Sequence, residues 1–272
     1  MKPAPLPYLT MLLEALLPVA RQAGSVIMEI YASPFVVRGK EDDSPVTDAD
    51  LAAEAVILKA LAQLTPAIPV VAEEQMSAGH EPEPSHSFWL IDPLDGTREF
   101  VKRNGEFTVN IGLVADSLPI LGIVYAPAID RLFAGVCAAS VDPTGLNNAP
   151  GFAFEEREGK RRSIECRLVP TSDLTVACSR SHGREDDLDE FLKPWQVKNR
   201  VRIGSSLKFG LIAAGEADLY PRLSPTMEWD TAAGHAVVRA AGGAVTDRQH
   251  EELRYGKTAF RNGDFFAWGR RA

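Results

Sequence analysis

Residues 88–97, FWLIDPLDGT, join an apolar run to two carboxylates, and this stretch decides how the rest of the chain is interpreted. The apolar run predicts a short buried strand over 88–91, which delivers Asp92 and Asp95 to a turn. Paired acids at the end of a strand are typical of a metal site, because hard cations such as Mg²⁺ prefer oxygen ligands. A solvated Asp-Pro turn on a protein surface has a similar sequence, so the surrounding residues decide between the two.

The residues between and after these acids favour a ligand site. Pro93 disfavours helix at the residue before it, and Gly96 lets the backbone approach a ligand closely. Thr97 is a suitable residue to begin a helix, whose free N–H groups attract anions. The segment therefore predicts a place where cations and a phosphate group meet.

The composition is that of a globular protein with an acidic surface. Of 272 residues, 45% are hydrophobic and 24% are charged, which leaves room for one large domain or two smaller ones. The net charge of −8 argues against binding to nucleic acid polymers, which requires clustered Lys and Arg. It also disfavours an anionic substrate unless divalent metals reverse the local potential. Cys137, Cys166 and Cys178 are odd in number and lack metal-ligand spacing, which favours free thiols in a reducing cytoplasm.

The first thirty residues contain no evident membrane anchor. Glu14 and Arg21 interrupt the apolar positions before a membrane-spanning length is reached, and there is no secretory signal. We therefore expect a cytoplasmic protein without an integral membrane segment. The sequence leaves open a peripheral contact with the inner membrane, and it does not decide between a monomer and a homodimer.

Hydrophobic periodicity divides the chain into two halves near residue 170. The elements expected before it are helices over 7–32 and 47–64, strands over 68–72 and 88–91, three strands between 107 and 136, and short charged strands over 151–168. The elements expected after it are strands over 174–178, 201–203, 219–222, 244–246 and 265–268, with helices over 185–192, 206–214 and 230–241. The first half thus reads as α+β with an antiparallel sheet (1–170), and the second as alternating α/β (171–272). We interpret the whole chain, 1–272, as one α/β unit of mixed α+β character.

Acidic residues recur at the ends of predicted strands and the starts of predicted helices. They are Asp50, Glu73, Glu74, Asp92, Asp95 and Asp230, the last in EWDTAAGHAVVRAAGG. Each alone is equally well explained as a helix N-terminal residue or a surface turn. In the order D…EE…DPLDGT…WDTAA, however, they resemble the signature of the inositol monophosphatase superfamily of magnesium-dependent, lithium-sensitive phosphatases. The resemblance covers nearly the whole chain and no signature acid is missing.

This resemblance implies a layered α/β/α/β/α sandwich and a magnesium site. The implied ligands, for about two or three Mg²⁺ ions, are the carboxylates of Glu73, Asp92, Asp95 and Asp230, the carbonyl of Leu94 and the hydroxyl of Thr97. Asp92 is expected to bridge two ions. Because Asp230 comes from the second half, the site would be assembled from both halves of the chain.

The resemblance also implies catalytic roles. Thr97 and Asp50 would orient and deprotonate the attacking water, which requires hydrogen-bond reach. Glu74 would support this machinery from outside the coordination of the ions. The phosphate would lie against the N–H groups of Gly96 and Thr97. No covalent phosphoenzyme is expected.

Three further motifs resemble the bacterial 3′(2′),5′-bisphosphate nucleotidase branch of the superfamily. They are REF directly after DGT, SRSH at 179–182, and GSSLKFG…YPR at 204–222. By resemblance, Ser205, Lys208 and Arg222 would join Asp230 in contacting a nucleotide with a second phosphate, for which cations and hydroxyls are natural partners. His182 would lie near the base or sugar. Surface cations and a helix-capping serine explain the same residues without a ligand.

The expected activity is removal of the 3′-phosphate of adenosine 3′,5′-bisphosphate, giving AMP, and by extension action on its sulfated precursor. Such an enzyme would clear a by-product of sulfate assimilation. One alternative is an inositol-1-monophosphatase-like enzyme with broad sugar and inositol phosphate specificity, and fructose 1,6-bisphosphate stays open as a side substrate. Another is a non-catalytic nucleotide or phosphoinositide sensor. Aspartate-nucleophile phosphatases are disfavoured because two residues, not one, separate the acids of DPLDGT.

Three residues near the acids are not assigned chemistry. His235 lies one helical turn after Asp230, but an oxygen-rich site favours magnesium over metals that seek imidazole. We expect it to be a partly buried, hydrogen-bonded histidine. Trp89 and Trp229 are expected to pack against the walls of the site.

Overall fold

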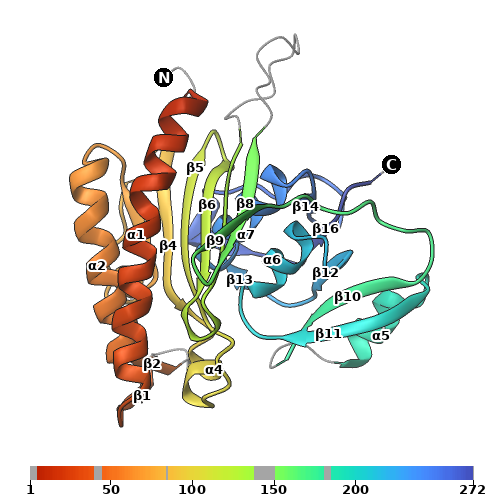
Figure 1. Ribbon diagram of the computed structural model, residues 1–272, viewed down its shortest axis with the longest axis horizontal. Coiled ribbons are helices and arrows are strands. Elements are labelled where there is room, and N and C mark those ends of the chain that lie inside the picture. The colour runs from red at the N-terminus through yellow and green to blue at the C-terminus, as the bar shows by residue number, and fades with distance from the viewer. Residues whose placement is uncertain (1–4, 40–44, 84, 138–150, 181–184, 272) are drawn as a thin grey trace.

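Five alternating layers of helix and sheet build the fold (Figure 1). The computed structural model describes residues 5–39, 45–83, 85–137, 151–180 and 185–271. From one side to the other, the layers are helices α1 (Leu6–Tyr31) and α2 (Asp48–Leu64), a seven-stranded sheet, helices α6 (Leu207–Ala213) and α7 (Glu228–Ala240), a five-stranded sheet, and helix α5 (Glu185–Leu192). The expected layered α/β sandwich is therefore confirmed.

The seven-stranded sheet has the order β3-β4-β5-β6-β7-β8-β9. Its strands are Val70–Ala72, Ser87–Asp95, Thr108–Ala115, Leu118–Ala126, Arg131–Val136, Phe152–Arg157 and Lys160–Ser163. β3 and β4 are parallel, and all the other neighbours are antiparallel. The antiparallel meander predicted between residues 107 and 136 is thus confirmed.

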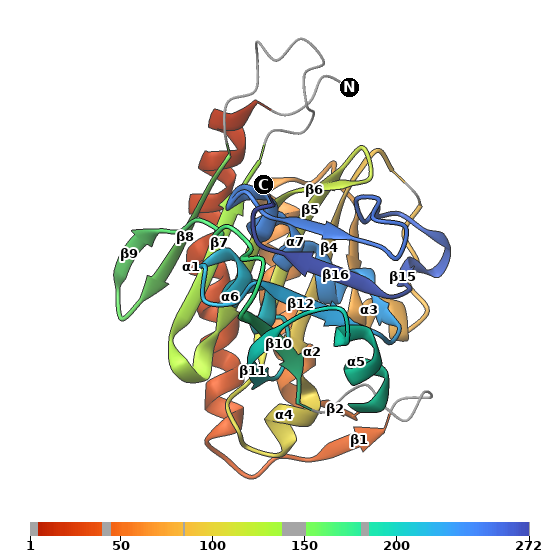
Figure 2. The same cartoon turned by 90° about the vertical axis from the view of Figure 1, so that its right-hand side faces the viewer.

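The five-stranded sheet has the order β11-β10-β12-β16-β14. Its strands are Val197–Ile203, Leu174–Ser179, Leu219–Arg222, Phe265–Trp268 and Ala244–Thr246. Short elements complete the chain: β1 (Val37–Gly39), β2 (Pro45–Thr47), α3 (Glu73–Ser77), α4 (Thr97–Val101), η1 (Pro127–Ile129), β13 (Thr226–Met227), η2 (Thr258–Phe260) and β15 (Arg261–Asn262). Figure 2 views the molecule from the side of this sheet, with α1 behind it.

Side chains alternate between the two faces of each sheet, which explains why both sheets are covered on both sides. On β16, Phe266 and Trp268 pack in the cluster that includes Leu192 of α5. Phe265 and Ala267, one residue out of phase, pack in the cluster formed with α6 and α7. A strand buried on both faces reads as a continuous apolar run, and FFAW is such a run.

Helix α7 rests almost directly on the seven-stranded sheet because three glycines leave it room. Gly112, Gly122 and Gly135 are register partners on β5, β6 and β7. A Cβ atom added to Gly122 would lie 2.1 Å from the carbonyl oxygen of Ala233, and one added to Gly112 would lie 2.9 Å from the Ala233 nitrogen. This glycine row therefore sets how closely α7, from the second half of the sequence, approaches the sheet of the first half.

We expect Gly122→Ala to lower the free energy of unfolding by about 1–3 kcal/mol, because the added methyl group overpacks the α7 interface. Urea denaturation measures the change. Gly263→Ala is the matched control, since no atom lies within 4 Å of a Cβ added there, and its effect should stay within about 0.5 kcal/mol. Equal urea midpoints for the two variants would contradict the close packing of α7 on β6.

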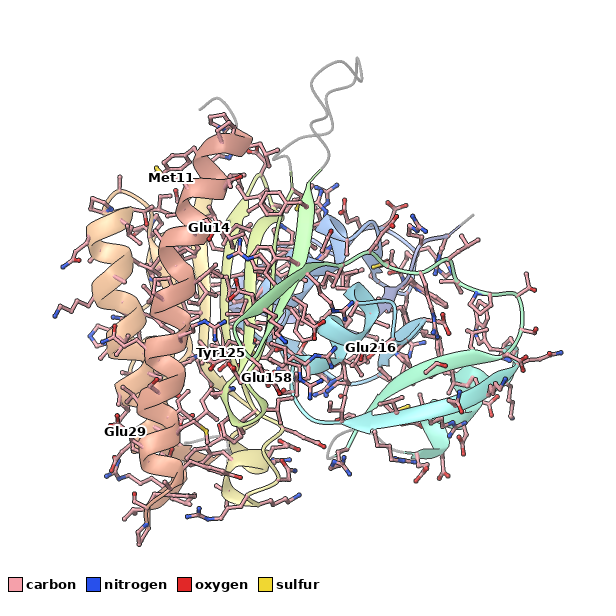
Figure 3. All side chains as sticks on the ribbon, viewed as in Figure 1. Met11, Glu14, Glu29, Tyr125, Glu158 and Glu216 are labelled. Carbon is pink, nitrogen blue, oxygen red and sulfur yellow. The ribbon has the colours of Figure 1, made fainter. Side chains whose placement is uncertain are left out.

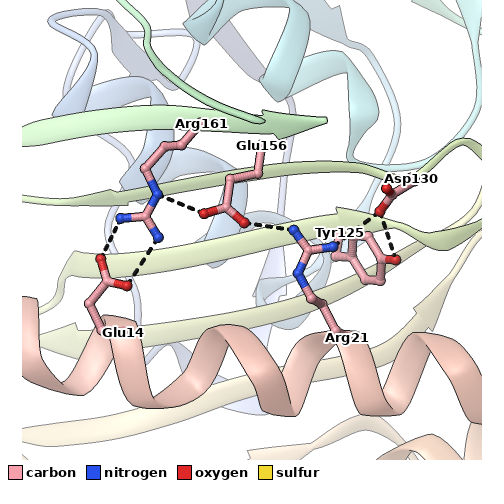
Figure 4. Close-up of polar contacts among 6 residues, drawn as sticks. All are labelled: Glu14, Arg21, Tyr125, Asp130, Glu156 and Arg161. Atoms are coloured by element: carbon pink, nitrogen blue, oxygen red, sulfur yellow. Dashed lines mark hydrogen bonds and ion pairs between the residues drawn. The ribbon is translucent and has the colours of Figure 1, made fainter. Parts of the chain in front are cut away.

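Helix α1 is a packed layer of the fold. Among the described residues it is the one helix with the length and apolar composition of a membrane span, yet its apolar face lies in the core with α2 and the sheet. Its outer side carries exposed residues such as Met11 and Glu29 (Figure 3). A ladder of ion pairs and hydrogen bonds then joins it to the sheet, linking in order Glu14, Arg161, Glu156, Arg21, Asp130 and Tyr125 (Figure 4). The charges that interrupt the apolar pattern of this helix thus attach it to β8, to β9 and to the turn between β6 and β7.

Candidate active site

A β-bulge in β4 brings the two acids of DPLDGT to one side of the sheet. Asp92 is the register partner of Asn110 and Asp95 that of Thr108, so three steps along β4 match two steps along β5. In a regular strand, residues three apart point to opposite faces, and the extra residue of a bulge reverses this. The prediction that the strand ends before Asp92 was wrong, because the bulge accommodates Pro93, which has no N–H to donate to the ladder.

Residues from both halves of the chain line one cavity of about 220 Å³ beside this bulge. The candidate metal ligands that line it are Glu73, Asp92, Leu94, Asp95, Thr97 and Asp230. Glu73 begins helix α3, and Asp230 lies in the first turn of α7. The fold thus gathers four carboxylates that are up to 157 positions apart in sequence (from Glu73 to Asp230) in one pocket.

The donor set fits a hard divalent cation. All of the gathered groups offer oxygen, which Mg²⁺ prefers. Burial raises the pKa of Asp92 well above its usual value, and the neighbouring carboxylates of Glu73, Asp95 and Asp230 raise it further. Burial raises the pKa of Asp95 to about 6, although Lys208 opposes this shift. Acids that repel one another in this way are stabilised together by a cation between them.

These acids line the same cavity, but their side chains are not already arranged as a metal coordination site. Within the described ranges, no group of three His, Cys, Asp or Glu side chains already has the geometry of a metal centre. The fit therefore rests on the kind of donor and on the shared pocket, and the individual coordination bonds remain a prediction.

Asp50 and Thr97 are in hydrogen-bond contact at the edge of the cavity. The Thr97 hydroxyl lies 3.2 Å from Oδ1 of Asp50 and 3.3 Å from the carbonyl oxygen of Leu94. The other Asp50 oxygen, Oδ2, accepts hydrogen bonds from the N–H and hydroxyl of Thr47, each at 2.8 Å, as part of a capping box at the start of α2. The Asp50 carboxylate is therefore held rigidly with one oxygen toward Thr97, which lines the cavity.

Gly96 has the backbone conformation that its residue type suggested. Its φ is 93°, in the left-handed region that favours glycine, and it precedes the short helix α4 as its N-cap. A Cβ atom at this position would lie 3.1 Å from the carbonyl oxygen of Glu106. Gly96 therefore lets β4 turn sharply into α4 beside the cavity.

The same cavity is lined by the candidate nucleotide-binding residues. Ser205, Lys208 and Arg222 all line the cavity. Lys208 is only 2% exposed, and its ammonium group donates to the carbonyl oxygens of Ile203 (3.2 Å) and Ser205 (2.5 Å). Burial lowers the pKa of Lys208 to about 8. The buried Nε of Arg222 has no hydrogen-bond partner among the described residues, so this guanidinium retains an unused donor.

Sequence reasoning missed Ser206, which links the segment carrying Ser205 and Lys208 to Asp95 and to strand β5. Its N–H donates to Oδ2 of Asp95 at 2.5 Å. Its hydroxyl lies 2.6 Å from Oδ1 of Asn110 and 2.7 Å from the hydroxyl of Thr108. The available signal was the pair of polar residues in the otherwise apolar strand TVNIGLVA, both fully buried. The cavity is also lined by Arg98, Glu99, Ser179 and Thr231, to which no role had been assigned.

The structure also places four other residues that the sequence analysis discussed. Glu74 is buried behind the cavity, with its N–H donating to Oε2 of Glu54 at 2.8 Å. Trp229 lines the cavity as expected. Trp89 does not line it, because its indole N–H donates to Thr65 in the core under α2. His235 is fully buried.

The SRSH motif is only partly described. Ser179 lines the cavity, and Arg180 pairs with Glu106, whose carboxylate also accepts the N–H of Gly204. His182 lies outside the described residues.

Comparison with known proteins agrees with this geometry. The sequence profile of the Inositol monophosphatase family matches residues 9–267. Over 246 residues the chain is 46% identical to the 3'(2'),5'-bisphosphate nucleotidase CysQ of Salmonella typhimurium and 44% identical to that of Escherichia coli K12, covering 90% of this chain and 94% of each relative.

Among solved structures, CysQ from Bacteroides thetaiotaomicron has a TM-score of 0.73 and 33% identity, covering 95% of this chain and 97% of that one. An inositol monophosphatase from Anabaena has a TM-score of 0.72 and 25% identity, covering 96% and 92%. With a family match over nearly its whole length and relatives this similar, the chain belongs to the inositol monophosphatase family.

Proposed function

We propose that this chain is a 3′(2′),5′-bisphosphate nucleotidase that removes the 3′-phosphate of adenosine 3′,5′-bisphosphate, giving AMP and phosphate. The observation that carries the proposal is a cavity lined both by four carboxylates and by the cations Lys208 and Arg222. An ester with two phosphates suits such a cavity, because one phosphate can bind through metal ions held by the carboxylates and the other can bind the cations. Identity of 44–46% to nucleotidases over 90% of the chain supports the same activity.

We propose that magnesium is the cofactor held by these carboxylates. Glu73, Asp92, Asp95 and Asp230 would hold the ions, with the Leu94 carbonyl and the Thr97 hydroxyl as further oxygen donors. Bound magnesium lowers the pKa of an attacking water and neutralises charge on the leaving oxygen of an in-line displacement. Inhibition by lithium remains a prediction of the family resemblance.

The contacts around Asp50 support a role in moving the water's proton. A water beside the Thr97 hydroxyl can donate its proton to Thr97 Oγ1, while that hydroxyl donates its own to Asp50 Oδ1, 3.2 Å away. Asp50 Oδ2 stays bound to Thr47, so the accepting oxygen does not need to move. The phosphate would lie beside the Gly96 and Thr97 N–H groups, with its leaving oxygen pointing away from the attacking water.

Of the two cations that line the cavity, Arg222 is the residue better placed to bind the second phosphate. Its Nε is buried and lacks a hydrogen-bond partner among the residues that the structure describes. Two donors of Lys208 already bind carbonyl oxygens, so Lys208 would mainly contribute charge and fix the turn that carries Ser205. The nucleoside would then span the cavity between the carboxylates and Arg222.

The test is a comparison of kcat/KM for adenosine 3′,5′-bisphosphate and inositol 1-phosphate with magnesium present. We expect a preference of about 10- to 100-fold or more for the bisphosphate, because each charge-assisted hydrogen bond to the second phosphate contributes about 1.5–3 kcal/mol. Arg222→Met should remove most of this preference while affecting inositol 1-phosphate little. Fructose 1,6-bisphosphate and the sulfated nucleotide belong in the same screen. A higher kcat/KM for inositol 1-phosphate would overturn the proposed substrate.

We also propose a cytoplasmic location and a role in clearing the by-product of sulfate assimilation. All three cysteines are free and buried, which suits a reducing compartment. Burial raises the pKa of Cys137 to about 11 and that of Cys166 to about 12, so neither thiol is expected to react at neutral pH.

A further inference from the structure

The orientation of Asp230 depends on the backbone that precedes it. The helix begins at Glu228, two residues earlier than expected, so Asp230 lies inside its first turn. One carboxylate oxygen, Oδ2, accepts the N–H of Met227 at 2.9 Å. Asp230 lines the cavity, and its other oxygen is therefore the one that a cation would meet. Any shift of Met227 would turn this carboxylate.

Asn262 is hydrogen-bonded to residues before the start of this helix and to one in its first turn. Asn262 is 2% exposed and lies on β15, which pairs with β13 at Thr226 and Met227. Its Nδ2 lies 3.1 Å from the carbonyl oxygen of Met227, 3.3 Å from the hydroxyl of Thr226 and 3.0 Å from that of Thr231. Because a carbonyl can only accept, the amide nitrogen must face Met227, which fixes the orientation of this side chain.

Thr231 extends these contacts into a one-directional chain. Its hydroxyl donates to the carbonyl oxygen of Glu228 at 3.1 Å and accepts from the hydroxyl of Tyr255 at 3.2 Å. Tyr255 lies 3.0 Å from Nδ1 of His235. Since the Tyr255 proton is used toward Thr231, Nδ1 of His235 must carry the proton in the next bond. Each hydroxyl in this chain therefore has a defined donor and a defined acceptor. Together these hydrogen bonds stabilise the first turn of α7.

His235 remains neutral in this chain. Burial lowers the pKa of its imidazole well below the usual value, and Arg239, Lys257 and Arg254 lower it further. Its Nε2 has no hydrogen-bond partner among the described residues, and the nearest carboxylate oxygen, on Glu252, is 3.9 Å away. The sequence predicts a partly buried, hydrogen-bonded histidine; the hydrogen bond is confirmed, but the residue is fully buried. His235 lies at the far end of a hydrogen-bond chain that leads to the helix start carrying Asp230.

We infer that Asn262 is a positioning residue for the metal site, and that it acts with Thr231 to hold Asp230 in the orientation that binds a cation. This inference rests on the proposed magnesium site. Mg²⁺ tolerates little deviation from octahedral geometry, so a small rotation of one ligand weakens binding. Hydrogen-bond partners behind a metal ligand change affinity or activity by about 10- to 100-fold when they are removed.

The test is direct Mn²⁺ binding, measured by the loss of the free Mn²⁺ EPR signal without substrate. Asn262→Leu and Thr231→Val keep approximate volume but remove the bonds, and we expect each to weaken Mn²⁺ binding about 10-fold. Thr231→Ser retains the hydroxyl and should stay within about threefold of the wild type. In activity assays, higher magnesium should restore kcat of Asn262→Leu and Thr231→Val, because binding and not the chemical step is impaired.

The matched control is Thr65→Val, which removes another buried hydroxyl that accepts a hydrogen bond, from Trp89 in the core. It should lower stability while leaving Mn²⁺ affinity within about twofold. If Asn262→Leu fails to fold, the Thr231→Val and Thr231→Ser pair decides. Unchanged Mn²⁺ affinity in the folded Thr231→Val variant, or an equal loss in Thr231→Ser, would overturn the inference. A wild-type protein that binds Mn²⁺ but does not hydrolyse the bisphosphate would instead refute the proposed function.

Discussion

Asp92→Asn is expected to lose about 1,000-fold or more in kcat/KM for adenosine 3′,5′-bisphosphate. Asp92 lies at the bulge where carboxylates from three elements meet, and the proposed bridging role requires two charged oxygens. Metal ions contribute several kcal/mol of transition-state stabilisation, and each 1.36 kcal/mol corresponds to a factor of ten in rate. Initial rates of phosphate release over a range of substrate concentrations, at several magnesium concentrations, measure the loss in kcat/KM.

The same substitution should leave the protein folded, which separates a chemical effect from a structural one. The pKa of Asp92 is raised by burial and by the surrounding acids, so its ionised form disfavours the folded state at neutral pH. A neutral amide does not have this cost. We therefore expect the metal-free variant to be at least as stable as the wild type and to gain no stability from added magnesium.

Asp130→Asn is the matched control for this experiment. Asp130 is a partly exposed acid in the ladder between α1 and the sheet (Figure 4). The Asp130→Asn variant should keep wild-type activity. Magnesium-dependent turnover by Asp92→Asn, or an equal loss in Asp130→Asn, would contradict the assignment. Absence of magnesium-dependent phosphate release in the wild type would favour a non-catalytic sensor.

Asp50→Asn should lower kcat by about 100-fold or more while leaving Mn²⁺ affinity unchanged. The loss is that expected when a general base is removed, about 10²- to 10⁴-fold. Asn can still accept hydrogen bonds from Thr47, so the start of α2 is preserved. It cannot, however, take a proton from Thr97, which lies 3.2 Å from Oδ1. Single-turnover phosphate release measures the chemical step directly.

Asp48→Asn serves as its control, because Asp48 lies in the first turn of the same helix and pairs only with the exposed Arg38 among the described contacts. We expect it to retain full activity. A kcat for Asp50→Asn within threefold of the wild type would remove Asp50 from the proposed mechanism and leave the metal site untouched.

The sequence predicted those elements whose apolar period is strong. The strands TVNIGLVA and LPILGIVYA are long and buried on both faces, so their apolar content alone identifies them. The bulge in β4 could not be predicted, because Pro93 equally suits the end of a strand. Strands of two residues, such as β13 and β15, are too short to show any period. Yet these two strands support the loop before Asp230.

The candidate site was predicted as a set of residues and not as a set of contacts. The acids are recognisable from their order along the chain, but the partners that orient them come from distant segments. Ser206 bonds Asp95 across 111 positions, and Asn262 bonds Thr226 across 36. Polar residues in buried strands, such as Asn110, are the one sequence signal for these partners, because a buried polar group requires a bond.

The most direct test of the central claim is a crystal structure of the wild-type protein grown with Mn²⁺, with an anomalous difference map that locates the ions. We predict peaks in the cavity beside β4, coordinated by Asp92 and Asp95 together with Glu73 on one side and Asp230 on the other. Manganese peaks bound elsewhere, with these four carboxylates free of metal, would contradict the account.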